Sequence, residues 1–329
     1  VLGTNVPRQN SADLKTKGWE LTVNYKDQFN IAAKPFRFDA KVVLSDSRAH
    51  ITKFQNDQRL LSDYFEGYEF GALYGLVGNG FFKSQAEIDA LDESAIVPWG
   101  ALSIVNGWPK FEDLDGNGKI ELGLTEKDMK DRKVIGNTSD RLRIGFNLSM
   151  DWNGFDGSVF LQGVLKRDFY PGHYLFWGPY QQPYANIYPW HLDFYRETSD
   201  SPEQRAKHSD SYIAAGLADE NHDSSYPVLQ SWLADANDGK GLAIPNTQYL
   251  LNGAYVRIKN ISLGYSLPNH IIERWKLGRV RFFVTGENIF EFSKVKKYVD
   301  PEAINNNTDN SAWAYPFQRK IAAGINLDF

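Results

Sequence analysis

The feature that most constrains this chain is a two-residue alternation of apolar and polar side chains, which recurs in seven separate segments. In residues 141–152 every second side chain is apolar, from Leu142 to Trp152, and those between are largely polar. Successive side chains of a β-strand point to opposite faces, so each segment predicts a strand with one apolar and one polar face. The seven expected strands cover residues 17–26, 36–45, 141–152, 155–166, 254–267, 279–290 and 317–329.

One of these segments, residues 254–267, changes the phase of its alternation between Ile258 and Ile261. An extra residue in one strand shifts every following side chain to the other face. The phase change therefore predicts a β-bulge at this point.

The connections between the expected strands alternate strictly between short and long. The short ones are residues 27–35, the dipeptide Asn153-Gly154 and residues 268–278; the long ones are about 46–140, 167–253 and 291–316. Asn-Gly is typical of a two-residue hairpin. Outer-membrane barrels have short turns at one end and long loops at the other, whereas loops of this length are uncommon inside compact soluble domains. We therefore predict an all-β chain that folds as a transmembrane antiparallel β-barrel, with the three long segments as external loops.

Aromatic side chains lie near the ends of many apolar faces. They include Trp19, Tyr25, Phe36, Trp152, Phe155, Tyr265, Phe290, Phe317 and Phe329. Membrane barrels carry aromatic girdles at both interfaces with water. In the alternative fold, a soluble β-sandwich, the same rings would fill the ends of a core. The alternating connections favour the barrel over the sandwich.

Composition excludes several functions. The net charge of −5 disfavours a nucleic-acid partner, and the lack of cysteine excludes disulfides, thiolate zinc sites and cysteine nucleophiles. No apolar stretch approaches the length of a transmembrane helix. The chain has no metalloprotease, nucleophile-elbow or phosphate-loop motif, so we predict that it is not an enzyme. A glycoside hydrolase that uses paired carboxylates is the least favoured alternative.

A series of motifs, in order along the chain, resembles the C-terminal part of SusC/RagA-type TonB-dependent transporters of Bacteroidetes. The matching stretches are YFEGYEFGALYGLVGNGFFKSQAEIDA (64–90), FEDLDGNGKIELG (111–123), residues 134–164, YVRIKNISLGYSLP (255–268), VRFFVTGENIFEFS (280–293) and DPE (300–302). One departure is Thr138, which follows Asn137 where the family usually has Asn-Pro.

This resemblance implies a 22-strand barrel with a plug inside it. Residues 1–329 would supply strands 16 to 22, and the N-terminal plug would lie outside this chain. Seven strands cannot close such a barrel, so the segments 17–26 and 317–329 should each keep one unpaired edge here. The implied function is import of oligosaccharides or oligopeptides across the outer membrane, with the chain as an integral outer-membrane protein. The alternative is a secreted, calcium-dependent, glycan-binding β-sandwich.

The partners that the resemblance implies are the N-terminal remainder of the transporter, a SusD-like surface lipoprotein, outer-membrane lipid, and a glycan or peptide substrate. TonB–ExbB–ExbD would act through the plug. No nucleic-acid partner and no required cofactor are expected.

Residues 113–123, DLDGNGKIELG, open like the calcium loop of an EF-hand. Position 12 of such a loop should be a carboxylate, but Leu124 stands there. A structural calcium or magnesium site is one interpretation, and a turn held by its own side chains is the other. The candidate ligands are Asp113, Asp115, Asn117, the carbonyl of Lys119, and Glu121 or Asp128.

An aromatic run covers residues 169–195, within the second long connection. Aromatics interleaved with polar side chains suit stacking on sugar rings or holding a peptide. Contact with a partner protein and packing of the loop on itself are the other two interpretations. The candidate contact residues are Tyr170, Tyr174, Trp177, Tyr180, Tyr184, Tyr188, Trp190 and His191.

Overall fold

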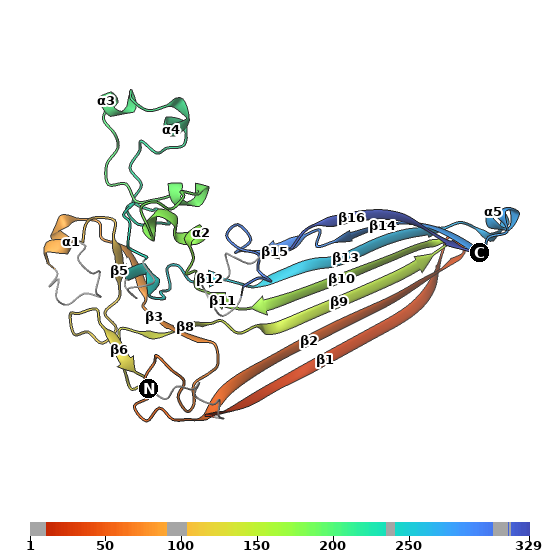
Figure 1. Cartoon of the computed structure of the whole chain (residues 1–329), viewed down its shortest axis with the longest axis horizontal. Coiled ribbons are helices and arrows are strands. Elements are labelled where there is room, and N and C mark those ends of the chain that lie inside the picture. The colour runs from red at the N-terminus through yellow and green to blue at the C-terminus, as the bar shows by residue number, and fades with distance from the viewer. Residues whose placement is uncertain (1–10, 91–103, 235–240, 305–314, 316) are drawn as a thin grey trace, which may run out of the picture.

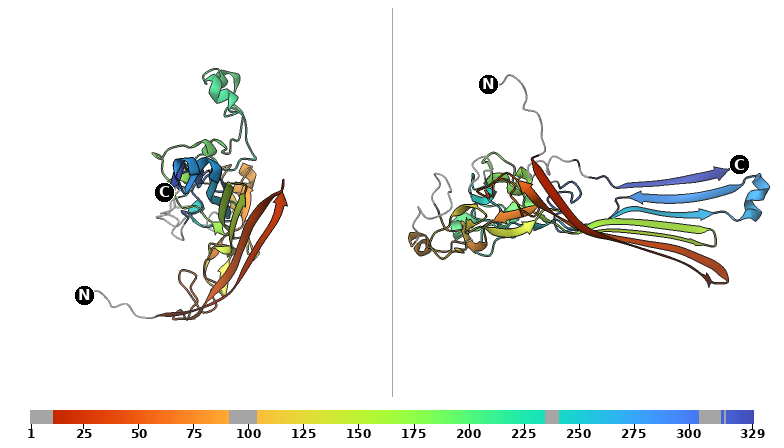
Figure 2. Two further views of the ribbon diagram at one scale, coloured as in Figure 1. Left: turned by 90° about the vertical axis from the view of Figure 1, so that its right-hand side faces the viewer. Right: turned by 90° about the horizontal axis from the view of Figure 1, so that it is seen from below.

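The computed structural model describes residues 11–90, 104–234, 241–304, 315 and 317–329. Its main feature is one long, curved antiparallel sheet, with irregular segments gathered at one end (Figures 1 and 2). Seven strands follow one another across the sheet in chain order. They are β1 (Ala12–Ile31), β2 (Lys34–Phe54), β9 (Arg141–Trp152), β10 (Phe155–Lys166), β13 (Tyr255–Ser266), β14 (Arg279–Glu287) and β16 (Lys320–Asp328). The short strand β15 (Glu291–Ser293) also pairs with β13.

The sheet does not close on itself within this chain. β1 pairs with β2 and β16 pairs with β14, and these two outer strands lie at opposite edges of the strand order. The predicted antiparallel β-architecture, with one open edge at each end, is therefore confirmed for the described residues.

The observed strand boundaries agree best with the predicted ones in the centre of the sheet. β9 and β10 begin and end as predicted, and β13 contains the predicted bulge. Phe160 pairs with Asn260 and Leu161 with Ile258, which leaves Lys259 as the extra residue.

Other boundaries differ from the prediction. β1 and β2 are about twice as long as expected, so the first connection shrinks from 27–35 to the dipeptide Ala32-Ala33. The last strand begins at Lys320 rather than at residue 317. Phe317 lies instead with its ring over the cations of Lys259 and Arg257, 4.4 Å and 5.2 Å from its centroid. Phe317 therefore lies before the last strand and not within it, and its girdle position stays a prediction.

The three short connections lie together at one end of the sheet (Figure 1). Asn153-Gly154 has positive φ at both residues, which is the conformation of a type I′ hairpin turn. Ala32-Ala33 has positive φ as well, 48° and 60°, although neither residue is a glycine. The third connection contains the short helices α5 (Asn269–Ile272) and η6 (Glu273–Trp275).

The long connections form a second body of structure at the other end. Between β2 and β9 lie β3 (Ala72–Gly75), β4 (Gly78–Phe81), α1 (Gln85–Asp89), β5 (Pro109–Phe111), β6 (Leu122–Thr125), β7 (Asp128–Lys130) and β8 (Lys133–Asn137). Between β10 and β13 lie β11 (Asp168–Phe169), α2 (Tyr174–Trp177), η2 (Gly178–Tyr180), η3 (Pro189–Leu192), α3 (Pro202–Arg205), α4 (Asp210–Ala214), η5 (Gly241–Ala243) and β12 (Leu251–Asn252). These helices and strands are too short to be predicted from the periodicity of apolar side chains. Part of the third long connection falls outside the described residues.

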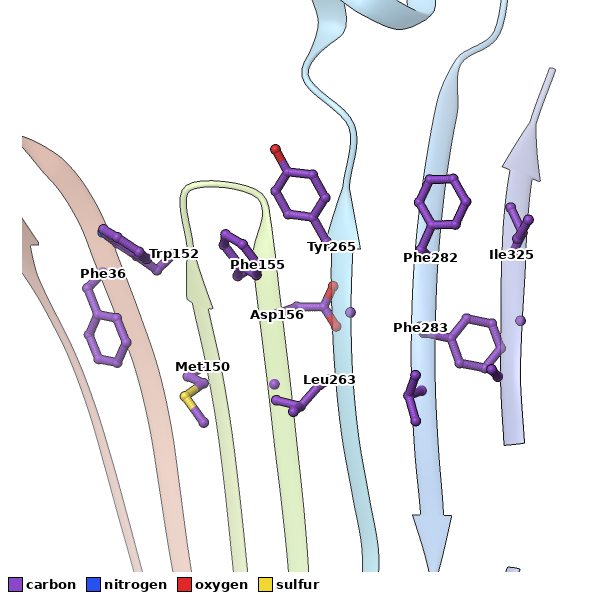
Figure 3. A pocket seen from close by; sticks show the side chains of 15 residues that line it. Phe36, Met150, Trp152, Phe155, Asp156, Leu263, Tyr265, Phe282, Phe283 and Ile325 are labelled. Carbon is purple, nitrogen blue, oxygen red and sulfur yellow. The ribbon is translucent and has the colours of Figure 1, made fainter. Parts of the chain in front are cut away.

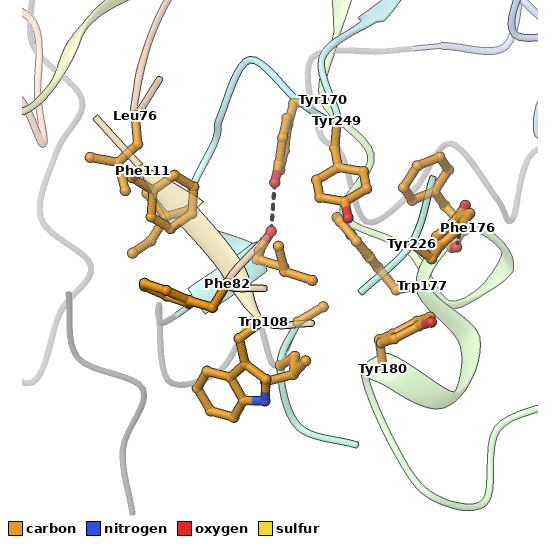
Figure 4. Close-up of a cluster of buried hydrophobic side chains, with 14 of the residues drawn as sticks. Leu76, Phe82, Trp108, Phe111, Tyr170, Phe176, Trp177, Tyr180, Tyr226 and Tyr249 are labelled. Carbon is orange, nitrogen blue, oxygen red and sulfur yellow. Dashed lines mark hydrogen bonds between the residues drawn. The ribbon is translucent and has the colours of Figure 1, made fainter. Parts of the chain in front are cut away.

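The hydrophobic core lies in the connections and not in the sheet. Trp108, Trp177, Tyr180 and Leu242 are fully buried in one cluster, part of which Figure 4 shows. In contrast, Leu263 and Ile325 on the sheet are 60% and 58% exposed. None of the described helices has the length and apolarity needed to cross a membrane.

Candidate functional site

One face of the sheet carries a continuous row of aromatic rings near the short turns. Neighbouring strands place them in register, each opposite the next, in the order Phe29, Phe36, Trp152, Phe155, Tyr265 and Phe282. The centroids of the Phe155 and Tyr265 rings are 4.5 Å apart (Figure 3). Further along the strands this face stays apolar, since Val42, Phe146, Leu161 and Ile258 are cross-strand neighbours. We call this surface the apolar face.

The opposite face of the sheet is polar. Lys26 contacts Asp39 at 2.7 Å across β1 and β2, and the Nε of Arg281 donates to Asp156 at 2.8 Å across three strands. Arg281 lies directly over Gly264, where a Cβ atom would meet the guanidinium at 2.4 Å. Only glycine leaves room for this arginine to lie flat against the wall. A sheet with one apolar and one polar face is what a barrel wall between lipid and a wet interior requires.

The loop of residues 113–118 is compact and held by its own side chains. The two oxygens of Asp113 accept hydrogen bonds from the backbone N–H groups of Gly116 and Gly118, both at 2.7 Å. These bonds, chiefly the one from Gly118, lower the pKa of Asp113. Asn117 also donates to Asp115 through its backbone and its side chain. Both glycines have positive φ, 73° and 79°, which the tight turn requires.

A third carboxylate, which the sequence analysis missed, completes this group. Asp131 is fully buried, and its ligand oxygen lies within 4.8 Å of those of Asp113 and Asp115. Its two oxygens accept hydrogen bonds from the N–H groups of Leu114 and Glu121, both at 2.7 Å. Asp131 thus brings the carboxylate that position 12 lacks. Its place 18 residues after Asp113 matches no spacing rule for such loops.

The other predicted ligands lie differently. Asp128, which was predicted as an alternative ligand, lies outside this carboxylate group, and its Oδ1 is 3.9 Å from the Nζ of Lys130. Glu121 accepts a hydrogen bond from the Asn117 side chain, and the backbone N–H of Lys119 donates to Asn117. Three convergent carboxylates fit the oxygen chemistry that Ca²⁺ and Mg²⁺ prefer. Ion binding by this group stays a prediction.

Half of the predicted contact residues of the aromatic run are buried in the core of the connections. Tyr170, Trp177, Tyr180 and His191 have almost no exposed surface. Tyr170 donates to the carbonyl of Leu242 at 2.6 Å, and Trp177 donates to that of Pro171 at 2.7 Å. For these four residues direct ligand contact was the wrong interpretation, because their rings and polar atoms are used in packing (Figure 4).

The remaining four residues of that prediction are accessible. Tyr174 and Tyr184 are 41% and 75% exposed. Tyr188 and Trp190 are half-buried, and their rings stack with centroids 5.0 Å apart. These four could still contact a ligand or a partner.

His191 fixes the position of this aromatic loop. Its Nδ1 accepts a hydrogen bond from the backbone N–H of Tyr188 at 3.0 Å, and its Nε2 donates to the carbonyl of Phe176 at 2.7 Å. This pattern needs the neutral imidazole. Burial lowers the pKa of His191, in the same direction. Gly178 has positive φ, and a Cβ there would meet the imidazole at 2.4 Å.

Buried ion pairs join the connections to the ends of the strands. Arg257 on β13 is buried and contacts the carboxylates of Glu291, Asp300 and Glu302. Arg167, also buried, contacts Asp140 at 3.0 Å and donates to the carbonyl of Gly253. The alternation gave no signal for these pairs, because they form between segments far apart in the sequence.

A curved sheet with an apolar and a polar face, short turns at one end and large ordered connections at the other defines the class of this chain as a segment of a β-barrel wall. No family model matches the chain. Two curated proteins of Formosa agariphila, TonB-dependent receptor P3 and TonB-dependent receptor P26, are each 24% identical to it over 358 and 352 residues. Each match covers 99% of this chain and 30% of the relative.

Solved structures agree. The RagAB peptide transporter matches with a TM-score of 0.63 and 20% identity, over 98% of this chain and 30% of the matched chain. The RagAB peptide importer in its 'open-open' state matches with a TM-score of 0.62 and 19% identity. The resemblance to TonB-dependent receptors of the RagA type is thus confirmed, and the sheet aligns with part of the RagA barrel. TonB-dependent receptors are outer-membrane β-barrel proteins and are not enzymes, as predicted.

Proposed function

We propose that this chain forms part of the wall and external loops of a TonB-dependent importer in the outer membrane. In this proposal residues 1–329 are the C-terminal portion of a 22-strand barrel domain. The seven long strands of the sheet, from β1 to β16, are strands 16 to 22 of that barrel. The chain spans about 30% of the length of the relatives it matches. The observation that carries the proposal is the pair of unlike faces, one apolar with an aromatic row and one polar with ion pairs.

The open edges of the sheet support the same conclusion. Among the described residues, β1 and β16 each pair on one side only. Lipid offers no hydrogen bonds to an unpaired strand edge. The missing neighbours in the membrane are therefore further strands of the same transporter, which also supplies the plug.

The substrate that we propose is an oligopeptide or an oligosaccharide. RagAB is described as a peptide transporter, and the external loops of the present chain hold exposed aromatics, such as Tyr184, that suit either ligand. A SusD-like lipoprotein would cover the loops from outside, and TonB–ExbB–ExbD would act on the plug.

The β-sandwich alternative is not favoured. A sandwich needs a second sheet packed about 10 Å from the first. Over residues 11–90, 104–234, 241–304 and 317–329, the other sheets have only two strands each and lie in the connections. The apolar face therefore has no second sheet against it in the described part of the chain.

The test uses the full-length protein in its own outer membrane. The proposal expects it to resist carbonate extraction, to dissolve only with detergent, and to take up a labelled oligopeptide or oligosaccharide only when TonB is present. Release by carbonate would contradict the membrane assignment. Uptake that persists without TonB would contradict the mechanism of energy supply.

A further inference from the structure

The apolar face contains a concavity beside its aromatic row. Its volume is about 730 Å³, and its rim includes Trp152, Tyr265 and Phe282 (Figure 3). The floor lies two residues along each strand from the aromatic row, away from the short turns. There Gly157 pairs with Met150 on one side and Leu263 on the other, and Ala323 pairs with Val284. A Cβ at Gly157 would meet Met150 at 3.1 Å and Leu263 at 3.4 Å, so these two side chains lie over the glycine, and a larger residue there would displace them toward the concavity.

The lining suits a hydrocarbon chain better than a peptide. Ten of the fifteen lining residues have side chains on the apolar face, and of these only Tyr265 and Trp152 carry a nitrogen or oxygen atom. A peptide seated here would lose the hydrogen bonds of its backbone to water and gain few in return. An acyl chain has no such requirement, and the volume lies within the usual range for ligand pockets, roughly 300–1,000 Å³.

A basic turn lies directly beyond this concavity. Residues 267–278, which include α5, follow the strand of Tyr265 and precede the strand of Phe282 (Figure 1). Arg274 and Lys276 are exposed, as is the acidic Glu273 beside them, so residues 267–278 carry a net charge of +1 with histidine neutral. The other two short turns, Ala32-Ala33 and Asn153-Gly154, carry no charge. Of the three turns, the one next to the concavity is therefore the one with a net positive charge.

We propose that the concavity and this turn together bind one anionic phospholipid. Its acyl chain lies over Gly157, and its phosphate lies at Arg274 and Lys276. The inference rests on the proposed membrane-spanning function, since it needs the apolar face to meet lipid. Aromatic rings at the level of the headgroups and basic residues just beyond them are the elements with which membrane proteins hold anionic lipids.

The experiment uses the full-length transporter in nanodiscs made of phosphatidylethanolamine alone or with one part in five of phosphatidylglycerol. Lipid that stays bound after transfer to detergent is identified by native mass spectrometry. We expect the wild-type protein to retain phosphatidylglycerol in preference to phosphatidylethanolamine. Combined Arg274→Gln and Lys276→Gln changes should reduce that preference about tenfold or more, because each basic residue near an anionic surface contributes roughly a factor of five.

Two further variants separate the parts of the site. Gly157→Leu fills the concavity and should reduce retention of both lipids, and Ala323→Leu does so from β16 if the first variant fails to assemble. Lys34→Gln, which removes a basic residue beside the Ala32-Ala33 turn, is the matched control and should retain lipid as the wild type does. Inorganic phosphate should not displace the lipid.

Equal retention of both lipids, or an unchanged preference in the Arg274 and Lys276 variant, would overturn the inference. Displacement by inorganic phosphate would overturn it too, because it would indicate a site for the phosphate alone. If the protein is integral but shows no preference, only this inference fails. If the protein is not integral, the proposed function fails as well.

Discussion

The carboxylates of Asp113 and Asp131 lie within 4.8 Å of each other, although 18 residues separate them in the chain. The buried Asp131 accepts hydrogen bonds from the backbone N–H groups of Leu114 and Glu121, which flank the loop. The third carboxylate of this group therefore comes from outside the motif in the sequence.

If this group binds an ion, Asp131 is its most sensitive member. Calcium or magnesium should raise the unfolding temperature of the full-length protein, with ligand oxygens about 2.3–2.6 Å from calcium or 2.0–2.1 Å from magnesium. Asp131→Asn should abolish that rise, whereas Asp128→Asn should leave it unchanged. Scanning calorimetry with and without a chelator measures both. Equal losses in the two variants would restore Asp128 as a ligand.

A charge on the apolar face should cost far more than one on the polar face. Ile144 and Asn147 lie on the same strand but on opposite faces. Ile144→Lys should destabilise the barrel by roughly 2–4 kcal/mol near the middle of the membrane, and Asn147→Lys by much less. Urea unfolding in lipid vesicles measures the difference. Equal costs at both positions would place neither face against lipid.

The Ala32-Ala33 turn should become more stable with glycine. Both alanines have positive φ, which costs an L-residue roughly 1–2 kcal/mol. Ala33→Gly should recover about 1 kcal/mol, while Ala40→Gly within β2 should destabilise the strand. The same unfolding assay, or the rate of barrel assembly, reports the change. A loss of stability in Ala33→Gly would show that the alanine side chain makes a contact that outweighs the strain.

Acid should loosen the aromatic loop through His191. Burial lowers its pKa in the folded state below the ordinary value of 6.5, so the unfolded chain binds the proton more readily. The stabilisation is complete above about pH 6.5 and is lost as the pH falls from there toward the folded pKa. Fluorescence of Trp177 and Trp190, followed against pH, should show this opening. In His191→Gln the dependence should flatten; an unchanged curve would assign the acid response to another group.

Removing Arg257 should release the segment that follows β15. Arg257 holds three carboxylates in a buried site, and breaking such a network typically costs about 3–5 kcal/mol. Arg257→Gln should increase protease cleavage near residues 300–304. Arg37→Gln, which removes an exposed pair with Asp151, is the control and should cut no faster than the wild type.

The strands of the sheet were predictable from the sequence where one face carries apolar side chains and the other carries polar ones. β9 and β10 were predicted to the residue because their apolar and polar side chains alternate at most positions and Asn153-Gly154 marks the turn. At the ends far from their shared turn, β1 and β2 extend past the prediction because polar side chains lie on both faces there, such as Lys15 opposite His50. Alternation cannot show a strand whose faces are alike.

The candidate site was less predictable, for two physical reasons. Asp131 lies near Asp113 because the fold brings these two residues together, and the spacing of residues in a motif cannot predict such a contact. The aromatic run has the composition of a binding loop and also that of a packed core, and only the fold shows that Tyr180 and His191 are buried while Tyr184 is exposed.

The buried cluster of the connections includes no residue of the seven long strands. If the chain forms the wall and loops of the proposed importer, mutations inside the loops can therefore change recognition at the outer surface without disturbing insertion of the wall. Substitutions on the apolar face should then affect contact with lipid and leave substrate recognition unchanged. Natural substitutions in this chain should thus divide into two nearly independent sets, one in the connections and one on the sheet. The buried ion pairs of Arg257 and Arg167 join the two regions, so they are among the few places where a change in one set constrains the other.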